Sequence, residues 1–402
     1  MDDEVDRSGR SVSRRRLLQG GAVLGTASVA GCFGMFGDGG GTETPVNASV
    51  SDFRGTGPLV EGNFRGSGRL AKGRPYPGGT SINELPDLSG TLALYIGGGE
   101  GGLYMNLINK LESIYPDFTV EPRSNDSASL AQTIVQQVNS GVSRGDVFWS
   151  IDASSLGYVA DHGAYEPLSE KAVEPVAKPQ FVGTDNAWAG VAGRARSVPY
   201  NTQELEASEI PDKVQQFPET SALRGTMGWA PTYGAFKSFV TAMRLIRGDA
   251  ATRRWLIDMR EAGTERYGNE YAVSQSVANG TIAAGFANHY YALRVKNQRP
   301  DAPLDLAFTE NDAGALVNVS GALKIKGTDK GDLVDNFVRH LLSAEAQEFF
   351  ATVAFSYPMI EGVKPVGNLP PISELNPPSI DLSKLSNVQA TIELMKSANV
   401  SP

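Results

Sequence analysis

The turn Asn288-His289-Tyr290-Tyr291 carries two consecutive tyrosines at the point where a strand-like run gives way to a helical pattern. Neighbouring residues of a helix point about 100° apart, and at such a turn both phenols can face one cleft. A phenolate oxygen is a hard anionic donor that suits a highly charged metal ion, and a bound trivalent ion removes the phenol proton. The pair could instead form a cleft wall or a sugar platform, which is the commoner role. The residues alone leave both interpretations open.

Two other strand-to-helix turns each carry one acidic side chain. Glu100 stands alone among the glycines of 97–102, where a helix dipole would favour a negative group. Glycines there could also offer N–H groups to an anion, or simply form a flexible turn. No lysine follows the last glycine, so the turn does not have the phosphate-loop pattern. Asp152, which follows the apolar run 146–151, is either a ligand or a helix N-cap.

A fourth turn runs from Pro231 to Phe236. Exposed N–H groups at Gly234 and Ala235, at the start of the following helix, could hold an oxyanion. Tyr233 either faces the ligand or packs half-buried. The pattern therefore adds an anion site to the candidate metal site, without deciding the role of the tyrosine.

Catalytic motifs are scarce in this chain, which has only three histidines, His162, His289 and His340. The sequence contains no nucleophile elbow, no H-E-x-x-H pattern and no cysteine–histidine pair. We therefore expect that the protein is not an enzyme. A secreted hydrolase that uses Glu100 and Asp152 is a remote alternative.

Strand-like and helical patterns alternate from residue 89 onward, which predicts an α/β fold with parallel βαβ units. The apolar run 91–96 is followed by Tyr104, Leu107, Ile108 and Leu111, which recur on one helical face. Ser127 or Ser129 is the expected cap of the second helix. The remaining predicted strands are 118–121, 146–151, 282–288 and 317–325, and the predicted helices are 130–138, 155–162, 236–246, 250–262, 273–277, one from about 290, 332–342, 344–353 and 382–397.

The composition is that of a soluble globular chain of 402 residues, with 41% hydrophobic and 20% charged residues. The net charge of −9 argues against nucleic acid as the main partner. A single cysteine, Cys32, excludes a disulfide within the chain.

The first 31 residues predict an export signal. Arg14 and Arg15 precede a short apolar stretch that is too short to span a bilayer, an arrangement typical of the twin-arginine route. The stretch ends at Val29-Ala30-Gly31-Cys32, which resembles a lipobox. We expect Cys32 to be lipidated and to anchor the protein on the outer face of the cytoplasmic membrane. Residues 32–88 predict a Gly- and Pro-rich tether followed by an extended segment.

Residues 90–400 resemble the ferric-iron-binding receptors of ABC importers, a family of periplasmic binding proteins. The resemblance is carried by eight stretches in order, which are 193–196, 200–201, 228–232, 277–280, 288–291, 316–318, 343–347 and 349–350. It implies a type II periplasmic-binding-protein architecture of two lobes, each a mixed, mainly parallel sheet flanked by helices and joined by crossover strands. The implied N-lobe is 89–197 plus 314–361, and the implied C-lobe is 198–313 plus 362–402.

The resemblance also implies the ligand set. Fe(III) would bind Tyr290 and Tyr291, which replaces the packing interpretation of that pair. The family's histidine position falls near Gly99 and its carboxylate position near Ile151, so neither ligand is present as such. Glu100 and Asp152 each stand one residue away as substitutes.

Members of this family hold a synergistic anion, commonly carbonate or phosphate, at the helix start that matches 233–235. Tyr233 would be either a third tyrosine ligand, which some relatives use in place of the anion, or a side chain that excludes the anion sterically. The candidate anion contacts are Gly234, Ala235, Asn288 and, more weakly, Asn269.

The resemblance thus implies an extracellular receptor that captures Fe(III) between two lobes and delivers it to an ABC permease and its ATPase. We expect a monomer. The alternative is a receptor of the same fold for an organic ligand such as thiamine or a phosphonate, stacked on Tyr290 and Tyr291.

Overall fold

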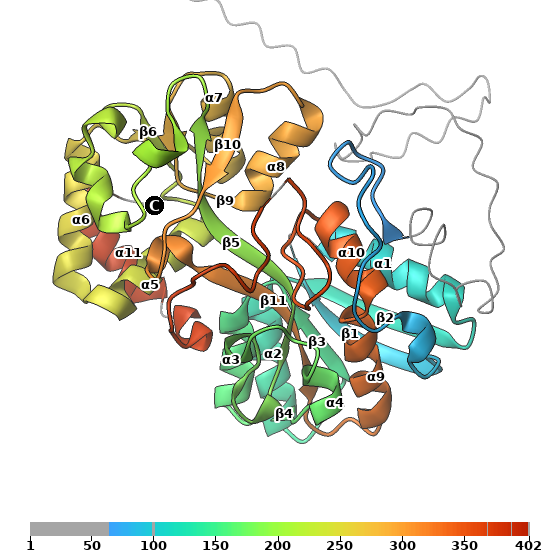
Figure 1. The fold of residues 1–402 in the computed structure, drawn as a ribbon. Helices are drawn as coiled ribbons and strands as arrows, with labels where there is room; N and C mark the ends of the chain where they lie inside the picture. Colours follow the sequence, from blue (N-terminus) through green and yellow to red (C-terminus); the bar gives the residue numbers. More distant parts are fainter. Residues whose placement is uncertain (1–63, 99–100, 368, 387, 401–402) are drawn as a thin grey trace, which may run out of the picture. The chain divides into compact units, whose positions relative to one another are not determined.

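The computed structural model describes residues 64–98, 101–367, 369–386 and 388–400 (Figure 1). The predicted export signal, Cys32, most of the predicted tether and Glu100 lie outside the described residues.

Three parallel strands form the first group, in the order β2-β1-β3. Helices follow each of them along the chain, and the predicted face of the first helix is buried, from Tyr104 to Leu111. The second helix is capped by Asp126, whose carboxylate accepts from the Ser129 N–H at 2.9 Å, so the expected caps Ser127 and Ser129 were wrong. The elements are β1 (Gly90–Gly97), α1 (Gly101–Ile114), β2 (Phe118–Asn125), α2 (Ser127–Asn139), β3 (Val147–Ser150) and α3 (Ala153–Asp161).

A second parallel group has the order β8-β6-β7. The predicted strand 282–288 is two short strands, because β8 pairs with β6 while β9 pairs with a different part of β5. The tyrosine pair lies in the first turn of the helix that follows β9. The elements are β6 (Met227–Trp229), α5 (Gly234–Arg247), α6 (Asp249–Glu261), β7 (Glu265–Arg266), α7 (Glu270–Ala278), β8 (Ala284–Gly285), β9 (Ala287–Asn288) and α8 (His289–Gln298).

One long strand, β5 (Ala189–Asn201), runs from the first group to the second (Figure 1). Residues 189–195 pair antiparallel with β11 (Val317–Ile325), which continues to β3 and to β4 (Tyr165–Glu166). Residues 196–201 pair antiparallel with β9, β8 and β10 (Leu304–Ala307). Helix-flanked parallel strands joined by this crossover strand confirm the predicted α/β class.

The remaining helices cover the two groups. The 3-10 helix η10 packs against α3, and its Ser383 comes so close that a Cβ at Gly157 would lie 2.1 Å from the Ser383 Cβ. Helix α11 packs against α5 and α6. The α-helices are α4 (Glu170–Val173), α9 (Gly331–Leu341), α10 (Ala344–Thr352) and α11 (Val388–Ser397); the 3-10 helices are η3 (Ile82–Glu84), η4 (Pro179–Phe181), η5 (Thr184–Asn186), η6 (Ala207–Glu209), η7 (Val214–Glu219), η8 (Ser221–Leu223), η9 (Ala313–Ala315) and η10 (Leu382–Ser386).

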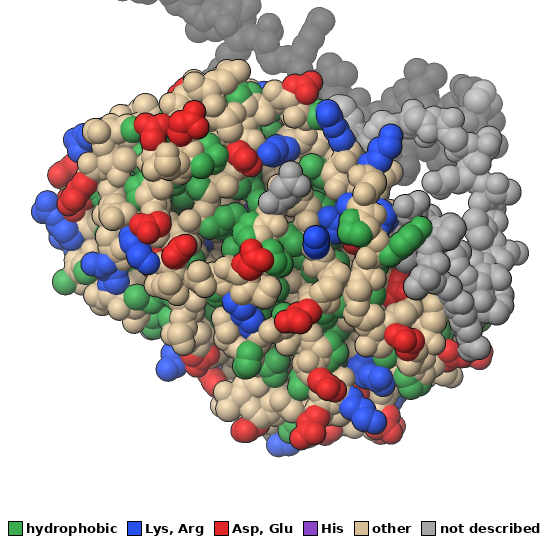
Figure 2. Space-filling view, viewed as in Figure 1, with side chains coloured by type: hydrophobic (Ala, Val, Ile, Leu, Met, Phe, Trp, Pro, Cys, Tyr) green, Lys and Arg blue, Asp and Glu red, His purple; other side chains and the backbone are tan. Residues whose placement is uncertain are grey.

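The surface seen in Figure 2 mixes acidic and basic side chains and gathers neither sign into one patch. Within the part of the chain that the structure describes, no helix combines the length and apolarity needed to cross a membrane.

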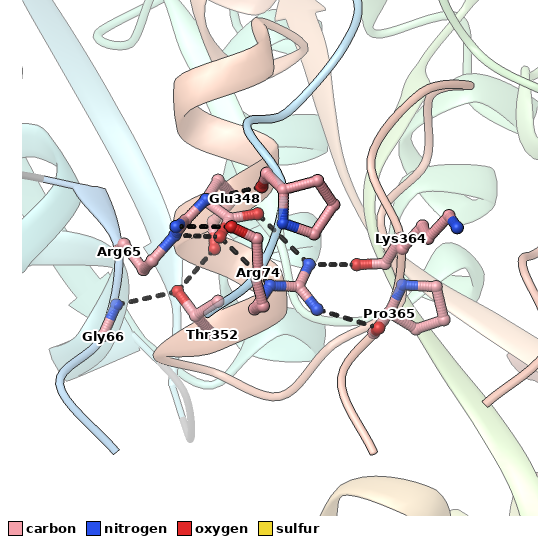
Figure 3. A network of polar contacts seen from close by, with 8 residues as sticks. Arg65, Gly66, Arg74, Glu348, Thr352, Lys364 and Pro365 are labelled. Atoms are coloured by element: carbon pink, nitrogen blue, oxygen red, sulfur yellow. Dashed lines mark hydrogen bonds and ion pairs between the residues drawn. The ribbon is translucent and has the colours of Figure 1, made fainter. Parts of the chain in front are cut away.

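The segment before β1 is bound to the folded part from Phe64 onward, with Phe64, Ala71 and Ile82 buried. Two of its arginines converge on Glu348 of α10 (Figure 3). Arg65 Nε donates to Glu348 at 2.7 Å and Arg74 Nε donates to it at 3.1 Å.

The same network reaches neighbouring backbone and side chains. Arg74 also donates to the carbonyl of Pro365 at 3.0 Å and to the carbonyl of Lys364, and the Gly66 N–H donates to Thr352 Oγ1 at 2.8 Å (Figure 3). The segment therefore is held by buried charge as well as by apolar packing.

Replacing Glu348 by alanine should lower the free energy of unfolding by about 3–5 kcal/mol, because two arginine side chains that are largely buried would lose their carboxylate. Urea denaturation followed by circular dichroism measures the change. Glu393→Ala, at an exposed site on α11, is the matched control and should change the value by about 0.5 kcal/mol or less. Equal losses in the two variants would contradict the role assigned to the network.

Candidate functional site

A cleft of about 960 Å³ is lined by residues of both strand groups. Helices α2, α3, α5 and α8 begin at its wall, and β5, β11 and the C-terminal elements complete it. The lining residues are Asp126, Ala128, Ala131, Gln132, Ile151, Asp152, Ser154, Ser155, Tyr158, Arg194, Arg196, Tyr233, Gly234, Ala235, Lys237, Ser238, Asn288, Tyr290, Leu316, Asn318, Leu385 and Val388.

Three tyrosines meet at this cleft. Tyr233, at the start of α5, and Tyr290, in the first turn of α8, are lining residues. Tyr291 is half-buried behind them, and its hydroxyl is hydrogen-bonded to that of Tyr233. The ring centroids of Tyr290 and Tyr291 are 4.3 Å apart, and those of Tyr233 and Tyr291 are 5.9 Å apart. The structure thus brings all three sequence-predicted tyrosines together.

The surroundings of Tyr291 keep its phenol protonated when no cation is near. Burial raises the pKa of Tyr291 far above its ordinary value, and the adjacent Tyr233 and the charge of Glu270 raise it further. A bound cation reverses this preference, because it stabilises the phenolate directly. Tyr291 is therefore a neutral side chain as long as no cation is near.

Arg294 lies against the tyrosine pair from the next turn of α8. Its guanidinium carbon is 5.2 Å from the ring centroid of Tyr290 and 5.6 Å from that of Tyr291. Contacts of this kind contribute about 0.5–2 kcal/mol, so they help to fix the two rings.

Helices α5 and α8 start at the cleft without a side-chain cap. Neither Tyr233 nor Asn288, their N-cap residues, accepts a capping hydrogen bond. At Gly234 an added Cβ would meet no atom within 4 Å, so open space lies over the backbone there. Uncapped N–H groups at a helix start favour an anion, which suits the role predicted for Gly234, Ala235 and Asn288.

Asp152 acts as the helix cap of α3. Its carboxylate accepts from the Ser155 N–H at 2.8 Å and from the hydroxyls of Ser154 and Ser155. It also lines the cleft, but these bonds occupy both of its oxygens. Of the two roles left open by the sequence, the structure shows the cap.

Asn269 is used in the same way at the start of α7. Its side chain accepts from the Ala272 N–H at 2.9 Å, and it is not among the residues that line the cleft. No group of three or more His, Cys, Asp or Glu side chains that could hold a metal occurs within the described ranges.

The sequence interpretation assigned no role to two cleft arginines of β5. Arg194 donates to the carbonyl of Ile151, the position near which the resemblance placed a carboxylate ligand. Arg196 is 2% exposed, and its Nη1 donates to Glu270. Nε and Nη2 of Arg196 have no hydrogen-bond partner among the described residues. The spacing Arg-x-Arg, which places both on one face of a strand, was the available signal.

The cleft lining carries three basic side chains, Arg194, Arg196 and Lys237, and two acidic ones, Asp126 and Asp152, so its formal charge is positive while that of the chain is negative. The cleft therefore combines tyrosine hydroxyls at or beside its wall, two uncapped helix starts and an excess of basic over acidic side chains. That combination suits a cation that arrives with, or is joined by, an anion.

Residues 106–374 match the family described as bacterial extracellular solute-binding protein. The major ferric iron-binding protein of Neisseria meningitidis serogroup B is 31% identical over 259 residues, which cover 63% of this chain and 78% of that protein. The Fe(3+)-binding periplasmic protein of Serratia marcescens is 25% identical over 282 residues, which cover 69% of this chain and 82% of that protein.

Among solved structures, the iron-bound HitA from Pseudomonas aeruginosa superposes with a TM-score of 0.64 at 26% identity. The match covers 77% of this chain and 99% of HitA. The similarity therefore extends over nearly the whole fold of that protein.

Two buried histidines make the stability of the protein sensitive to acid. Burial lowers the pKa of His289, beside the tyrosines, and of His340, in α9, to about 4. Because both folded pKa values lie below the ordinary value of 6.5, their contribution is complete above pH 6.5 and is lost as the pH falls toward 4.

We expect the free energy of unfolding to fall between pH 7 and pH 4.5, with each histidine accounting for up to about 3 kcal/mol. His340→Gln should flatten this dependence, because the amide does not gain a charge. Urea titrations at several pH values measure the slope. An unchanged slope in the variant would show that His340 does not carry the effect.

Proposed function

Because the chain belongs to the bacterial extracellular solute-binding protein family, we propose that it captures Fe(III) in this cleft and delivers it to an ABC permease. The observation that carries the proposal is the convergence of Tyr233, Tyr290 and Tyr291 at the cleft. The named functions of the relatives from Neisseria and Serratia support it.

The phenols would supply the protein ligands. Fe(III) is a hard, highly charged ion, and phenolate is among the hardest anionic donors that a protein offers. Binding would displace three protons, one each from the phenols of Tyr233, Tyr290 and Tyr291. Asp152 would keep its capping role, and Glu100 remains a ligand predicted from the sequence alone.

The remaining coordination positions would be filled by an anion, carbonate or phosphate. The uncapped N–H groups at Gly234 and Ala235 and the side chain of Asn288 would hold it on one side. Arg194 and Arg196 would neutralise it on the other. In this proposal the positive charges of the two arginines balance the negative charge of the anion. They do so at a site where Gly99 and Ile151 stand at or near the positions of two of the family's usual metal ligands.

We further propose that the protein is a monomer, is exported by the twin-arginine route and is held at the membrane by a lipid on Cys32. The pattern of residues 14–32 supports the export route and the anchor. The family description as extracellular agrees with this location.

Titration of the purified protein with ferric citrate should produce a visible absorption band from tyrosinate-to-iron charge transfer. The double variant Tyr290→Phe with Tyr291→Phe should lose most of the band, since only the Tyr233 phenol remains. It should bind Fe(III) more than about 100-fold more weakly, a larger loss than is typical when a neighbour of a ligand is removed. Absorption spectroscopy with a competing chelator measures both.

Tyr271→Phe is the matched control, since its ring centroid lies 6.4 Å from that of Tyr291 while its hydroxyl is bonded to Gln298 at 2.7 Å. It should retain the band. A colourless wild-type protein that instead binds a phosphonate or thiamine in calorimetry would favour the organic-ligand alternative.

Cys32→Ser should release the protein from the cell membrane into the medium, because serine provides no thiol for a lipid thioether. Fractionation of cells followed by immunoblotting compares the variant with the wild type. A variant that stays in the membrane fraction would refute the proposed anchor.

A further inference from the structure

Glu270 is a fully buried carboxylate next to the candidate site, and the proposed ligand set does not use it. It lies in the first turn of α7 with no exposed surface. Moving an ion out of water costs several kcal/mol unless charge and hydrogen bonds compensate for it. Glu270 must therefore be held by strong partners, and the structure gives it two.

The first partner of Glu270 is Arg196 of β5. Arg196 Nη1 donates to Glu270 Oε1, and both side chains are almost completely buried. The guanidinium carbon of Arg196 also lies 5.0 Å from the ring centroid of Phe239 in α5. These contacts orient the arginine while its Nε and Nη2, at the cleft wall, keep no hydrogen-bond partner among the described residues.

The second partner is the backbone N–H of Asn288, which donates to Glu270 Oε2 at 2.8 Å. Asn288 ends β9, pairs with Arg196 in the β5–β9 register and is the N-cap residue of α8. Tyr290 and Tyr291 follow two and three residues later. The Glu270 carboxylate thus holds both Arg196 and Asn288. Asn288 is the residue at which the helix that carries the tyrosine pair begins.

No side chain caps α8, so the direction of its first turn depends on what holds Asn288. A carboxylate that accepts from a backbone N–H forms a charge-assisted hydrogen bond, about twice as strong as a neutral one. The Glu270 contact is therefore a strong restraint on the first turn of α8 from outside the helix.

We propose that Glu270 is a positioning residue, which fixes the tyrosine pair and Arg196 relative to each other through its two carboxylate oxygens. The inference rests on the proposed Fe(III) binding. Glu270 itself would not touch the metal. Its loss would leave the tyrosines in place along the chain but change the direction of their hydroxyls.

The test is Glu270→Gln, titrated with ferric citrate and measured by absorption spectroscopy and chelator competition. The amide can accept from only one of the two donors, so we expect an affinity lower by about 10- to 100-fold and a shifted tyrosinate band. Thermal unfolding is recorded in parallel, because a purely structural role would lower stability without moving the band.

Glu345→Gln is the matched control. Glu345 is also a mostly buried acid in the first turn of a helix, and it accepts from the Ile82 N–H at 2.9 Å and from the Ser81 hydroxyl at 2.6 Å. It is not among the residues that line the cleft. It should lose stability and keep both band and affinity.

A second variant, Glu270→Asp, keeps the charge that Arg196 requires but shortens the side chain by one methylene. It keeps the inference testable if Glu270→Gln does not fold, and it should also shift the band. A wild-type band and affinity in either folded variant would overturn the positioning role alone. A wild-type protein that shows no band with Fe(III) would overturn the proposed function and the inference with it.

Discussion

The antiparallel pairing of β5 with both strand groups determines where each candidate ligand lies. Up to Ala195 the strand belongs with β11, and from Arg196 onward it belongs with β9 and β10. The change of partner occurs beside the cleft, where Arg194 pairs with Asn318 of β11 and Arg196 pairs with Asn288 of β9, and all four residues line it. Arg194 and Arg196 line the cleft for this reason, and β9 delivers the tyrosine pair to the same place.

The electrostatics of the cleft follow from what surrounds the phenols. Burial holds Tyr291 in its neutral form, and the cleft lining contains three basic side chains, Arg194, Arg196 and Lys237, beside the helix-capping carboxylates Asp126 and Asp152. An unaccompanied divalent cation would find no preformed negative charge on Tyr291. A trivalent ion can displace the phenol protons, and an anion can then satisfy the cationic wall and the uncapped starts of α5 and α8. The preference for a trivalent over a divalent ion and the need for an accompanying anion would thus both follow from the charges that surround the phenols.

Much of the fold was predictable from local pattern. The face formed by Tyr104 to Leu111 and the strand at 317–325 follow directly from apolar spacing, and both are present. Strand β5 was not predicted, because Gly190, Gly193 and Pro199 weaken its local strand signal and its pairing is entirely with distant strands.

The candidate site was predictable only in part. The tyrosines stand at a recognisable strand-to-helix turn, whereas Glu270 beside them looks like an ordinary first-turn acid of a helix. Its burial and its two partners arise from β5 and β9, which are 74 and 18 residues away along the chain. Asn269 and Asp152 have the residue types of ligands, but both cap helices, and only the three-dimensional structure separates the two roles.

The most direct test of the central claim is a crystal structure of the protein grown with Fe(III), with anomalous data collected at the iron absorption edge. The account predicts one strong anomalous peak within bonding distance of the hydroxyl oxygens of Tyr290 and Tyr291, with an anion between the metal and the start of α5. A peak outside the cleft, or a cleft filled by an organic ligand without any anomalous signal, would contradict it.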